Sequence, residues 1–234
     1  MIGIASTQLP VPGRESLRYM AREAANYVLL PEHPEALEFA RSAINQAIRE
    51  INSRSWKWAR ATFHFGLEEN VRIYDQVLPP DFKNLIDGRY LDVNLTPTTD
   101  QIEYVDPQNF RLRWAKPENG GTPIEFTVRL QHGTTGIGGA TAGHVVEFDR
   151  PLTAAAISRN PYFELFYYFR LPVLKDWDDV LRAPSEIGGL IVAHAKTEMA
   201  ANYDRSKYQA AERIRMRLWD QLRIDDNFSD DRES

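Results

Sequence analysis

The spacing of the apolar residues changes twice along this 234-residue chain, and that change limits the folds open to it. Between residues 35 and 53 apolar residues recur every three or four positions, which is the period of a helix with one apolar face. Between residues 60 and 179 they alternate with polar residues, the period of a half-buried strand. From residue 184 the helical period returns. The chain is therefore predicted to be α+β, with helices at both ends and a β-rich middle.

The helical segments are predicted at four places. Residues 14–30 form one helix, which Pro31 and Pro34 bring to an end, and residues 35–53 form the second. An alanine-rich helix covers 185–203, and a last one covers 206–222. Helices of this size cannot bury their apolar faces alone, so those of the two ends are expected to pack into one helical bundle. The middle is then an inserted antiparallel β-rich domain.

This interpretation divides the chain into four parts. Residues 1–59 are the N-terminal helical half, 60–179 the β-rich insertion, and 180–224 the helices that complete the bundle. Residues 225–234 hold five acids against one arginine and few apolar residues, so they are expected to form a mobile acidic tail.

The β-rich part contains several strands separated by turns. Alternation predicts strands at 63–67 and 71–74, joined as a hairpin by Glu69-Asn70. Further strands are expected at 84–95, 124–131, 144–149 and 162–171. A short turn or helix is expected around Asp106 to Phe110, and a turn between strands at Asn119-Gly120-Gly121. The run 162–171 is the most aromatic in the chain, which predicts that Phe166 and Tyr168 lie in a core or at a subunit contact.

The amino-acid composition excludes several kinds of functional site. The chain has no Cys, which excludes a disulfide scaffold, a thiolate zinc site and a cysteine nucleophile. Its five histidines are widely separated, and no metal-binding spacing occurs, so neither a metal nor a cofactor is expected. A formal net charge of −5 argues against broad binding to nucleic acid. No stretch is long and apolar enough for a membrane span, and no targeting signal begins the chain, so a soluble intracellular product is expected.

No catalytic motif emerges from the sequence. The glycine-rich segment 133–143 lacks the lysine of a phosphate-binding loop, and it is interpreted as a long flexible loop between strands. His194, on an apolar helix face, is interpreted as a core or interface histidine. Two other hypotheses stay open. Trp56, Trp58 and Trp114, with the acid pairs Glu68-Glu69 and Asp178-Asp179, could serve an enzyme acting on carbohydrates or nucleotides. The helix at 205–223 could bind DNA without sequence preference.

Several motifs occur in an order that resembles a known family. The helix at 36–51 leads to Trp56-Lys57-Trp58, and Tyr74 is followed by the string Leu78-Pro79-Pro80-Asp81-Phe82. Later come Asp106-Pro107-Gln108-Asn109-Phe110, then Tyr167-Tyr168-Phe169 with Pro172, and finally the alanine-rich helix. Over residues 35–222 this series resembles the head-to-tail adaptor, or connector, proteins of short-tailed bacteriophages.

The resemblance implies a structural protein of the virion, not an enzyme. Such adaptors form a ring, typically dodecameric, beneath the portal protein, and they receive the tail nozzle or tail fibre proteins. Genomic DNA passes through the ring's channel without specific recognition. The protein would then reside in the neck of the virion after assembly in the cytoplasm of the host bacterium, with no membrane contact. Aromatic and arginine side chains are favoured at such interfaces. The interface residues expected are Trp56, Trp58, Phe166, Tyr168, Arg213 and Arg217.

Overall fold

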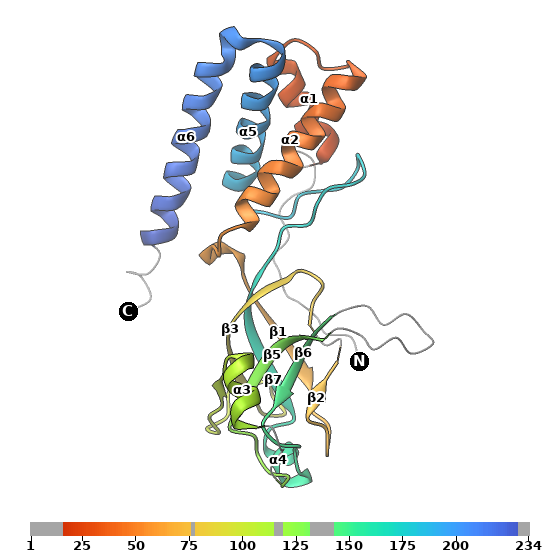
Figure 1. The fold of residues 1–234 in the computed structure, drawn as a ribbon, viewed down its shortest axis with the longest axis vertical. Helices are drawn as coiled ribbons and strands as arrows, with labels where there is room; N and C mark the ends of the chain where they lie inside the picture. The colour runs from red at the N-terminus through yellow and green to blue at the C-terminus, as the bar shows by residue number, and fades with distance from the viewer. Residues whose placement is uncertain (1–15, 76–77, 115–118, 132–142, 229–234) are drawn as a thin grey trace. The chain divides into compact units, whose positions relative to one another are not determined.

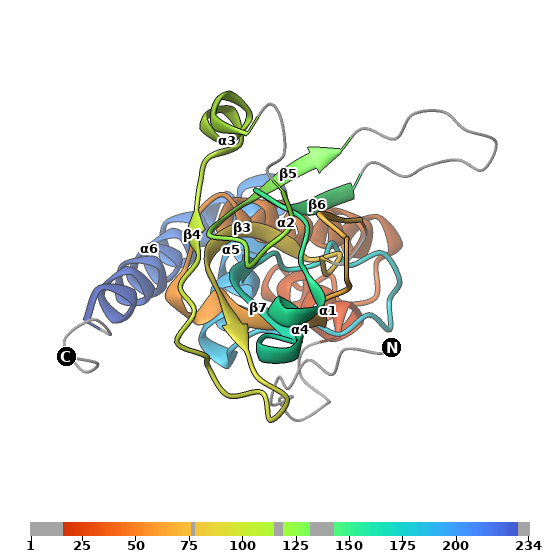
Figure 2. The ribbon, with the colours of Figure 1, turned by 90° about the horizontal axis from the view of Figure 1, so that it is seen from below.

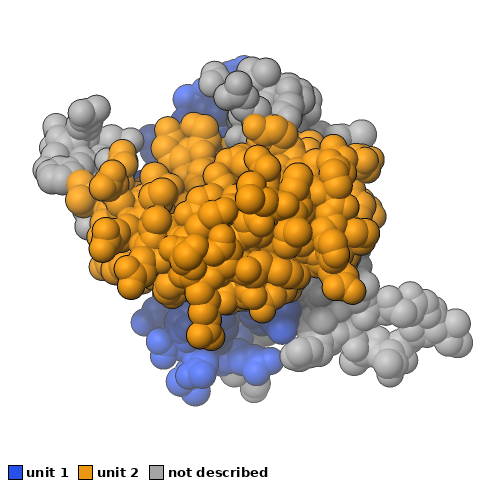
Figure 3. Space-filling model, turned by 90° about the horizontal axis from the view of Figure 1, so that it is seen from above, with its two compact units in different colours: residues 1–6, 60–169 blue, residues 7–59, 170–234 orange. Residues whose placement is uncertain are grey.

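The computed structural model describes residues 16–75, 78–114, 119–131 and 143–228. These residues divide into two compact units, which Figure 3 colours separately. Unit 1 is formed by residues 60–169, and unit 2 by the described residues before 60 and after 169. Together they contain six α-helices and two β-sheets within the described residues, which confirms the α+β class (Figure 1).

Unit 2 is helical. It contains α1 (Leu17–Tyr27), α2 (Pro34–Asn52), α5 (Ser185–Tyr203) and α6 (Arg205–Phe228), with a short 3-10 turn at Lys57–Ala59. Helices α1, α2 and α5 each contact the other two, and α6 packs along α5. The predicted helices are therefore confirmed, with starts and ends moved by a few residues.

Local chemistry explains where these helices begin. The Ser16 hydroxyl accepts a hydrogen bond from the Tyr19 N–H at 3.3 Å and so caps the start of α1. Pro34 occupies the first turn of α2, where its missing N–H costs no hydrogen bond. The helical stripe that the sequence shows is the buried face of α2, including Ala40, Ile44 and Ile48.

Helix α6 extends further than the sequence suggests. It ends at Phe228, and the Asp226 carboxylate accepts a hydrogen bond from the Lys57 backbone N–H at 2.7 Å. Residues 225–228, where the sequence predicts the start of a mobile acidic tail, therefore continue α6 instead of starting a separate segment. Residues 229–234 lie outside the described residues.

Unit 1 holds both sheets (Figures 1 and 2). The three-stranded sheet has the order β1-β7-β3, with β1 (Arg60–Gly66), β7 (Tyr162–Phe169) and β3 (Phe82–Leu91), all antiparallel. The four-stranded sheet has the order β2-β6-β5-β4. Its strands are β2 (Ile73–Tyr74), β6 (Gly143–Phe148), β5 (Glu125–Gln131) and β4 (Glu103–Tyr104), and only β4 and β5 are parallel. Two short helices, α3 (Pro107–Arg113) and α4 (Ala154–Arg159), complete the unit.

The predicted hairpin at Glu69-Asn70 is wrong, because its two strands belong to different sheets. Strand β1 pairs with β7, and β2 pairs with β6. Distant segments hold the connection between them: the Leu67 N–H donates to the Pro161 carbonyl, and the Asn70 N–H donates to the Leu152 carbonyl. The turn at Asn119-Gly120-Gly121 follows α3 instead of a strand, and α4 was not predicted. Most of the glycine-rich segment, 132–142, lies outside the described residues.

The core of unit 1 is a cluster of aromatic rings contributed by both sheets. Phe163 of β7 is its centre, with ring centroids 5.1 Å from Phe126, 5.2 Å from Phe148 and 5.4 Å from Tyr90. Gly88 of β3 lies against these rings. A Cβ at that position would come within 2.7 Å of the Phe126 ring, so only glycine fits there without movement.

Candidate interaction surfaces

Strand β7 presents two different faces, as the alternation of a strand requires. Phe163, Leu165 and Tyr167 are buried in the core of unit 1. Phe166 and Tyr168 lie on the opposite face and are half-buried. In the sequence the aromatic residues form one run, whereas the structure places them alternately in the core and on the outer face of the sheet.

On this outer face the aromatic rings lie beside cations. The Arg89 guanidinium lies 4.7 Å from the centroid of the Phe166 ring and pairs with Glu164 at 2.7 Å. Arg60 lies 6.0 Å from the centroid of the Tyr168 ring. Cation–π contacts hold these arginines in place while the rings remain partly accessible. A face that combines half-buried rings with ordered guanidinium groups resembles the composition of protein interfaces more than that of an ordinary surface.

Trp56 has a different role from the one expected. Only 4% of it is exposed, and its indole N–H donates to the Ile51 carbonyl at 2.8 Å. Its ring packs edge-on against Trp219 of α6, and Arg54 lies over both rings. Trp56 therefore fastens the end of α2 to α6 inside unit 2, and it is not available to a partner. Trp58, in the 3-10 turn that follows, is half-buried.

Helix α6 carries the two arginines expected at an interface. Arg213 and Arg217 are exposed and lie one helical turn apart. Large apolar side chains are exposed on the same helix: Ile214 is 51% and Met216 is 56% exposed, and Ile224 is 51% exposed. Ile214 and Met216 lie on nearly opposite sides of α6, so they are two separate apolar contact points and not one patch.

A groove of about 520 Å³ runs between α1, α5 and α6, all within unit 2. Ile214 and Leu218 of α6 line one side, and Met20 of α1 lines the other. The floor contains Gly188 and Gly189 of α5, and a Cβ placed on Gly189 would meet no atom within 4 Å. Gly189 places no side chain in the groove, so this part of it stays open. Nothing in the sequence pattern pointed to this groove, because it depends on the spacing between three helices.

A polar cluster lies where α2, α5 and α6 meet. His194 of α5 is 5% exposed, and its Nδ1 atom lies 3.5 Å from a carboxylate oxygen of Glu50. Arg215 of α6 pairs with Glu212 at 2.7 Å. Burial lowers the pKa of His194 below its ordinary value, although the carboxylates of Glu50 and Glu198 oppose that shift. The expectation of a buried core or interface histidine agrees with this position.

The groups proposed for an enzymatic site are used in other contacts or lie apart. The Trp114 indole N–H donates to Glu125 at 2.6 Å, and Glu125 also pairs with Arg113 at 2.8 Å. The acid pair Glu68-Glu69 lies in unit 1, whereas Asp178-Asp179 lies in unit 2. Among the described residues no group of three or more His, Asp or Glu side chains could hold a metal ion. No helix in the described part of the chain is long and apolar enough to cross a membrane.

Comparisons with known proteins identify no family for this chain. No family model matches the chain. No curated protein matches it at significant similarity.

Proposed function

We propose that this chain is a structural virion protein, the subunit of a head-to-tail adaptor ring in a short-tailed bacteriophage. The ring joins the portal protein to the tail nozzle or tail fibre proteins and extends the channel through which genomic DNA passes. In this proposal the four helices of unit 2 act as one helical bundle, and unit 1 is an antiparallel β-rich domain inserted into it. The motif order over residues 35–222 supports the family, and the surfaces of unit 2 support a ring.

The observation that carries the proposal is that α6 has two unlike apolar sides. Ile214 lines the groove with α1 and α5, whereas Met216 does not line it. Side chains two positions apart on a helix are separated by about 200° around its axis, so these two point in nearly opposite directions. One side of α6 is thus part of a hollow, and the other is an exposed ridge. A ring needs such a pair, because each subunit must present two different patches to its two neighbours.

We therefore place the ridge that carries Met216 in the groove of the adjacent subunit. The glycines in the floor of the groove leave room for an apolar side chain from outside. Arg213 and Arg217 then lie near this contact. The outer face of the three-stranded sheet, with Phe166 and Tyr168, is left for the tail components. No part of this arrangement requires catalysis, so the protein is proposed not to be an enzyme.

The purified full chain is mixed with portal protein, and the particles that form are measured. Light scattering gives their mass, and negative-stain microscopy shows whether they are rings. Wild-type protein is expected to form rings on the portal. The Gly189→Leu variant fills the groove and is expected to stay monomeric, with unchanged or higher thermal stability because leucine favours a helix more than glycine. The matched control, Gly189→Ala, adds one methyl group and should still assemble.

Met216→Glu tests the other half of the contact. A charge on the ridge should prevent assembly without unfolding the protein, since Met216 is exposed. Gln46→Glu places the same charge on an exposed position of α2 and serves as the control. If wild-type protein forms no rings with portal protein, the proposed function is wrong. If Gly189→Leu and Met216→Glu both form normal rings, the ring contact has been assigned to the wrong surface.

A further inference from the structure

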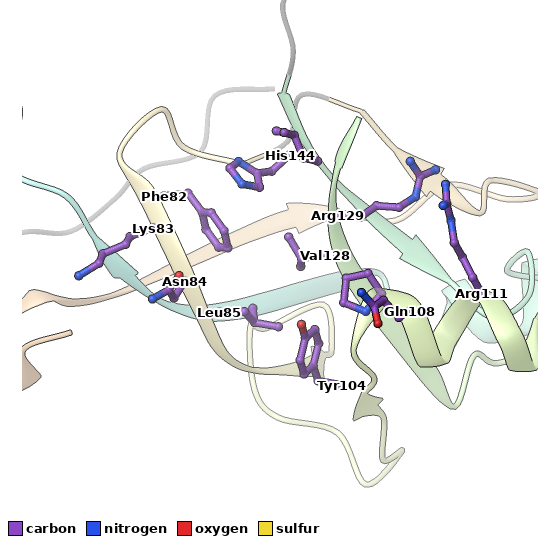
Figure 4. A pocket seen from close by; sticks show the side chains of 12 residues that line it. Phe82, Lys83, Asn84, Leu85, Tyr104, Gln108, Arg111, Val128, Arg129 and His144 are labelled. Carbon is purple, nitrogen blue, oxygen red and sulfur yellow. The ribbon is translucent and has the colours of Figure 1, made fainter. Parts of the chain in front are cut away.

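A second hollow, of about 520 Å³, lies in unit 1 between the edges of the two sheets. Figure 4 shows Phe82, Lys83, Asn84 and Leu85 along β3 on one side, and Val128 and Arg129 of β5 on the other. Phe82 and Val128 are buried and form an apolar floor. Its volume lies within the range of about 300–1,000 Å³ that is usual for ligand sites.

The hollow exists because one edge of β5 lacks a paired strand along part of its length. Strand β4 pairs with β5 only at Glu103↔Glu125 and Tyr104↔Phe126, and the Val105 N–H adds one more bond to the Phe126 carbonyl. Asp106 then caps α3, and the chain leaves the sheet, as Figure 2 shows. Beyond Phe126, nothing in the described part of the chain continues β4 beside β5.

Successive residues of a strand direct their backbone N–H and C=O groups to opposite edges, which shows which groups of β5 are left without a hydrogen-bond partner. The Phe126 carbonyl points toward β4, so two residues further on the N–H and C=O of Val128 point to the same side, as do those of Leu130. No backbone group in the described residues bonds to them on that side. On the far wall, β3 is the edge strand of its own sheet. Unpaired strand edges are templates onto which another extended chain can add.

The charge around the hollow indicates what kind of chain would fit. Basic side chains, Arg111 and Arg129 among them, line it, and no acidic residue lines it among those the structure describes. Arg129 pairs with Glu147 at 2.5 Å, but Glu147 also binds Arg72 at 2.8 Å, so this trio keeps one positive charge. The hollow is therefore positive and favours acidic side chains.

We propose that this hollow accepts an extended segment of a partner protein, with acidic and apolar side chains in alternation, as an added strand beside β5. The added strand would bond to the backbone of Val128 and Leu130. Its apolar side chains would lie inward beside Val128 and Phe82, and its acidic side chains outward beside Arg129 and toward Arg111. The same cations could attract nucleic acid, but nucleic acid would leave the backbone edge unpaired. The inference does not depend on the ring.

The experiment uses the full chain and a fluorescein-labelled peptide of alternating valine and glutamate, with binding followed by fluorescence anisotropy. The glutamate peptide should bind at least ten times more tightly than the matching peptides with glutamine or lysine. A version of the glutamate peptide N-methylated at alternate residues keeps every side chain but loses the backbone donors on one edge. It should lose binding by at least the same factor.

Two variants locate the site. Leu130→Pro removes the outward N–H of β5 but leaves the ladder with β6, which uses the groups of Arg129 and Gln131, and proline is tolerated at such edge positions. It should abolish peptide binding while circular dichroism stays unchanged. Arg111→Glu should weaken binding at least tenfold, whereas the control Arg159→Glu, an exposed arginine of the same unit, should not.

The outcomes distinguish the occupants. Equal binding of the N-methylated and parent peptides would overturn strand addition. Equal binding of the lysine and glutamate peptides would overturn the charge argument. If a labelled DNA oligonucleotide binds with the same dependence on Arg111, and the peptide does not bind, the hollow is a nucleic-acid site and the inference is wrong. If Leu130→Pro fails to fold, the N-methylated peptide and Arg111→Glu still decide the question. Failure of ring formation would leave all of these results unchanged.

Discussion

The two units bury different kinds of side chain. The largest buried side chains of unit 1 are aromatic, and Ala156 is its one fully buried alanine among the described residues. The core of unit 2 is aliphatic, with thirteen alanines beside fourteen leucine, isoleucine, methionine and valine side chains, and Trp56 is its one buried aromatic residue in the described part of the chain. The buried alanines of unit 2 are Ala21, Ala24, Ala25, Ala36, Ala40, Ala43, Ala47, Ala59, Ala183, Ala193, Ala195, Ala200 and Ala211.

Geometry explains the difference. Two packed sheets lie about 10 Å apart, and long side chains are needed to fill that space. Helix axes pack about 8–10 Å apart at a distance set by the side chains at the contact, and small side chains allow the closer approach. Unit 1 should therefore be most sensitive to removing atoms from its core, and unit 2 to adding them. The first two predictions test this contrast from each side.

Phe163→Ala should have the largest effect. It removes the ring that contacts Phe126, Phe148 and Tyr90, and it leaves a cavity that the two sheets cannot close. The free energy of unfolding, measured by urea denaturation, should fall by about 3–5 kcal/mol. Phe166→Ala on the other face of the same strand is the control and should cost much less. Equal losses for the two variants would contradict the assignment of β7's faces.

Ala195→Leu should destabilise unit 2 in the opposite way. Ala195 is fully buried on α5, and three extra carbons there must displace one of the helices packed against α5, which are α1, α2 and α6. Overpacking of this kind costs about 1–3 kcal/mol in the free energy of unfolding. Ala210→Leu makes the same change at an exposed position of α6, in the same unit, and should leave stability nearly unchanged. If the buried leucine proves neutral, unit 2 is packed more loosely than its alanine content indicates.

Asn52→Ala should have a smaller effect, because it removes hydrogen bonds and little volume. The Asn52 side chain donates to the Leu171 carbonyl and accepts from the Leu171 N–H, both at 2.9 Å. Asn45, two turns earlier on α2, binds Leu174 in the same way. The loss should be about 1–2 kcal/mol, since both backbone groups of Leu171 lose their partner. Gln46→Ala, on the exposed face of α2, is the control, and a loss as large as that of Asn52→Ala would contradict this interpretation.

These asparagines show where sequence reasoning reached its limit. The helices of unit 2 were predicted because their period is local and any window of the chain contains it. In the sequence Asn52 is only a polar residue at the end of a helix, because a sequence pattern cannot show that the chain returns alongside α2 more than a hundred residues later. Its role depends on a contact with Leu171, and residue spacing carries no signal for that contact.

The strands illustrate the same limit. The alternation in β1, β3, β5, β6 and β7 was visible, but alternation does not specify a partner strand. The Glu69-Asn70 pair suggests a hairpin between β1 and the next strand, β2. In the structure β1 pairs with β7 instead, which brings β1 to the aromatic core. For the candidate surfaces, residue type points to Phe166, Tyr168, Arg213 and Arg217, and their place at an interface stays a prediction. Residue type could not separate them from Trp56, which looks the same in sequence and is buried.

The smallest predicted effect concerns pH and unit 2 alone. Burial lowers the pKa of His194, so the folded state binds a proton there less readily than the unfolded state. The facing groups, Glu50 on α2, Glu198 on α5 and Arg215 with Glu212 on α6, change this shift but do not reverse it.

Stability linked to His194 should therefore be complete above its ordinary pKa of 6.5, and it should be lost as the pH falls below that value. The measurement is the free energy of unfolding between pH 8 and pH 5, compared with that of His194→Gln, which cannot take up a proton in this range. The difference in the free energy of unfolding between the two proteins should narrow toward acid pH. The pair that would make the opposite sign possible is buried His194 with the exposed carboxylate of Glu50, so a difference that widens toward acid pH would mean that their attraction outweighs burial.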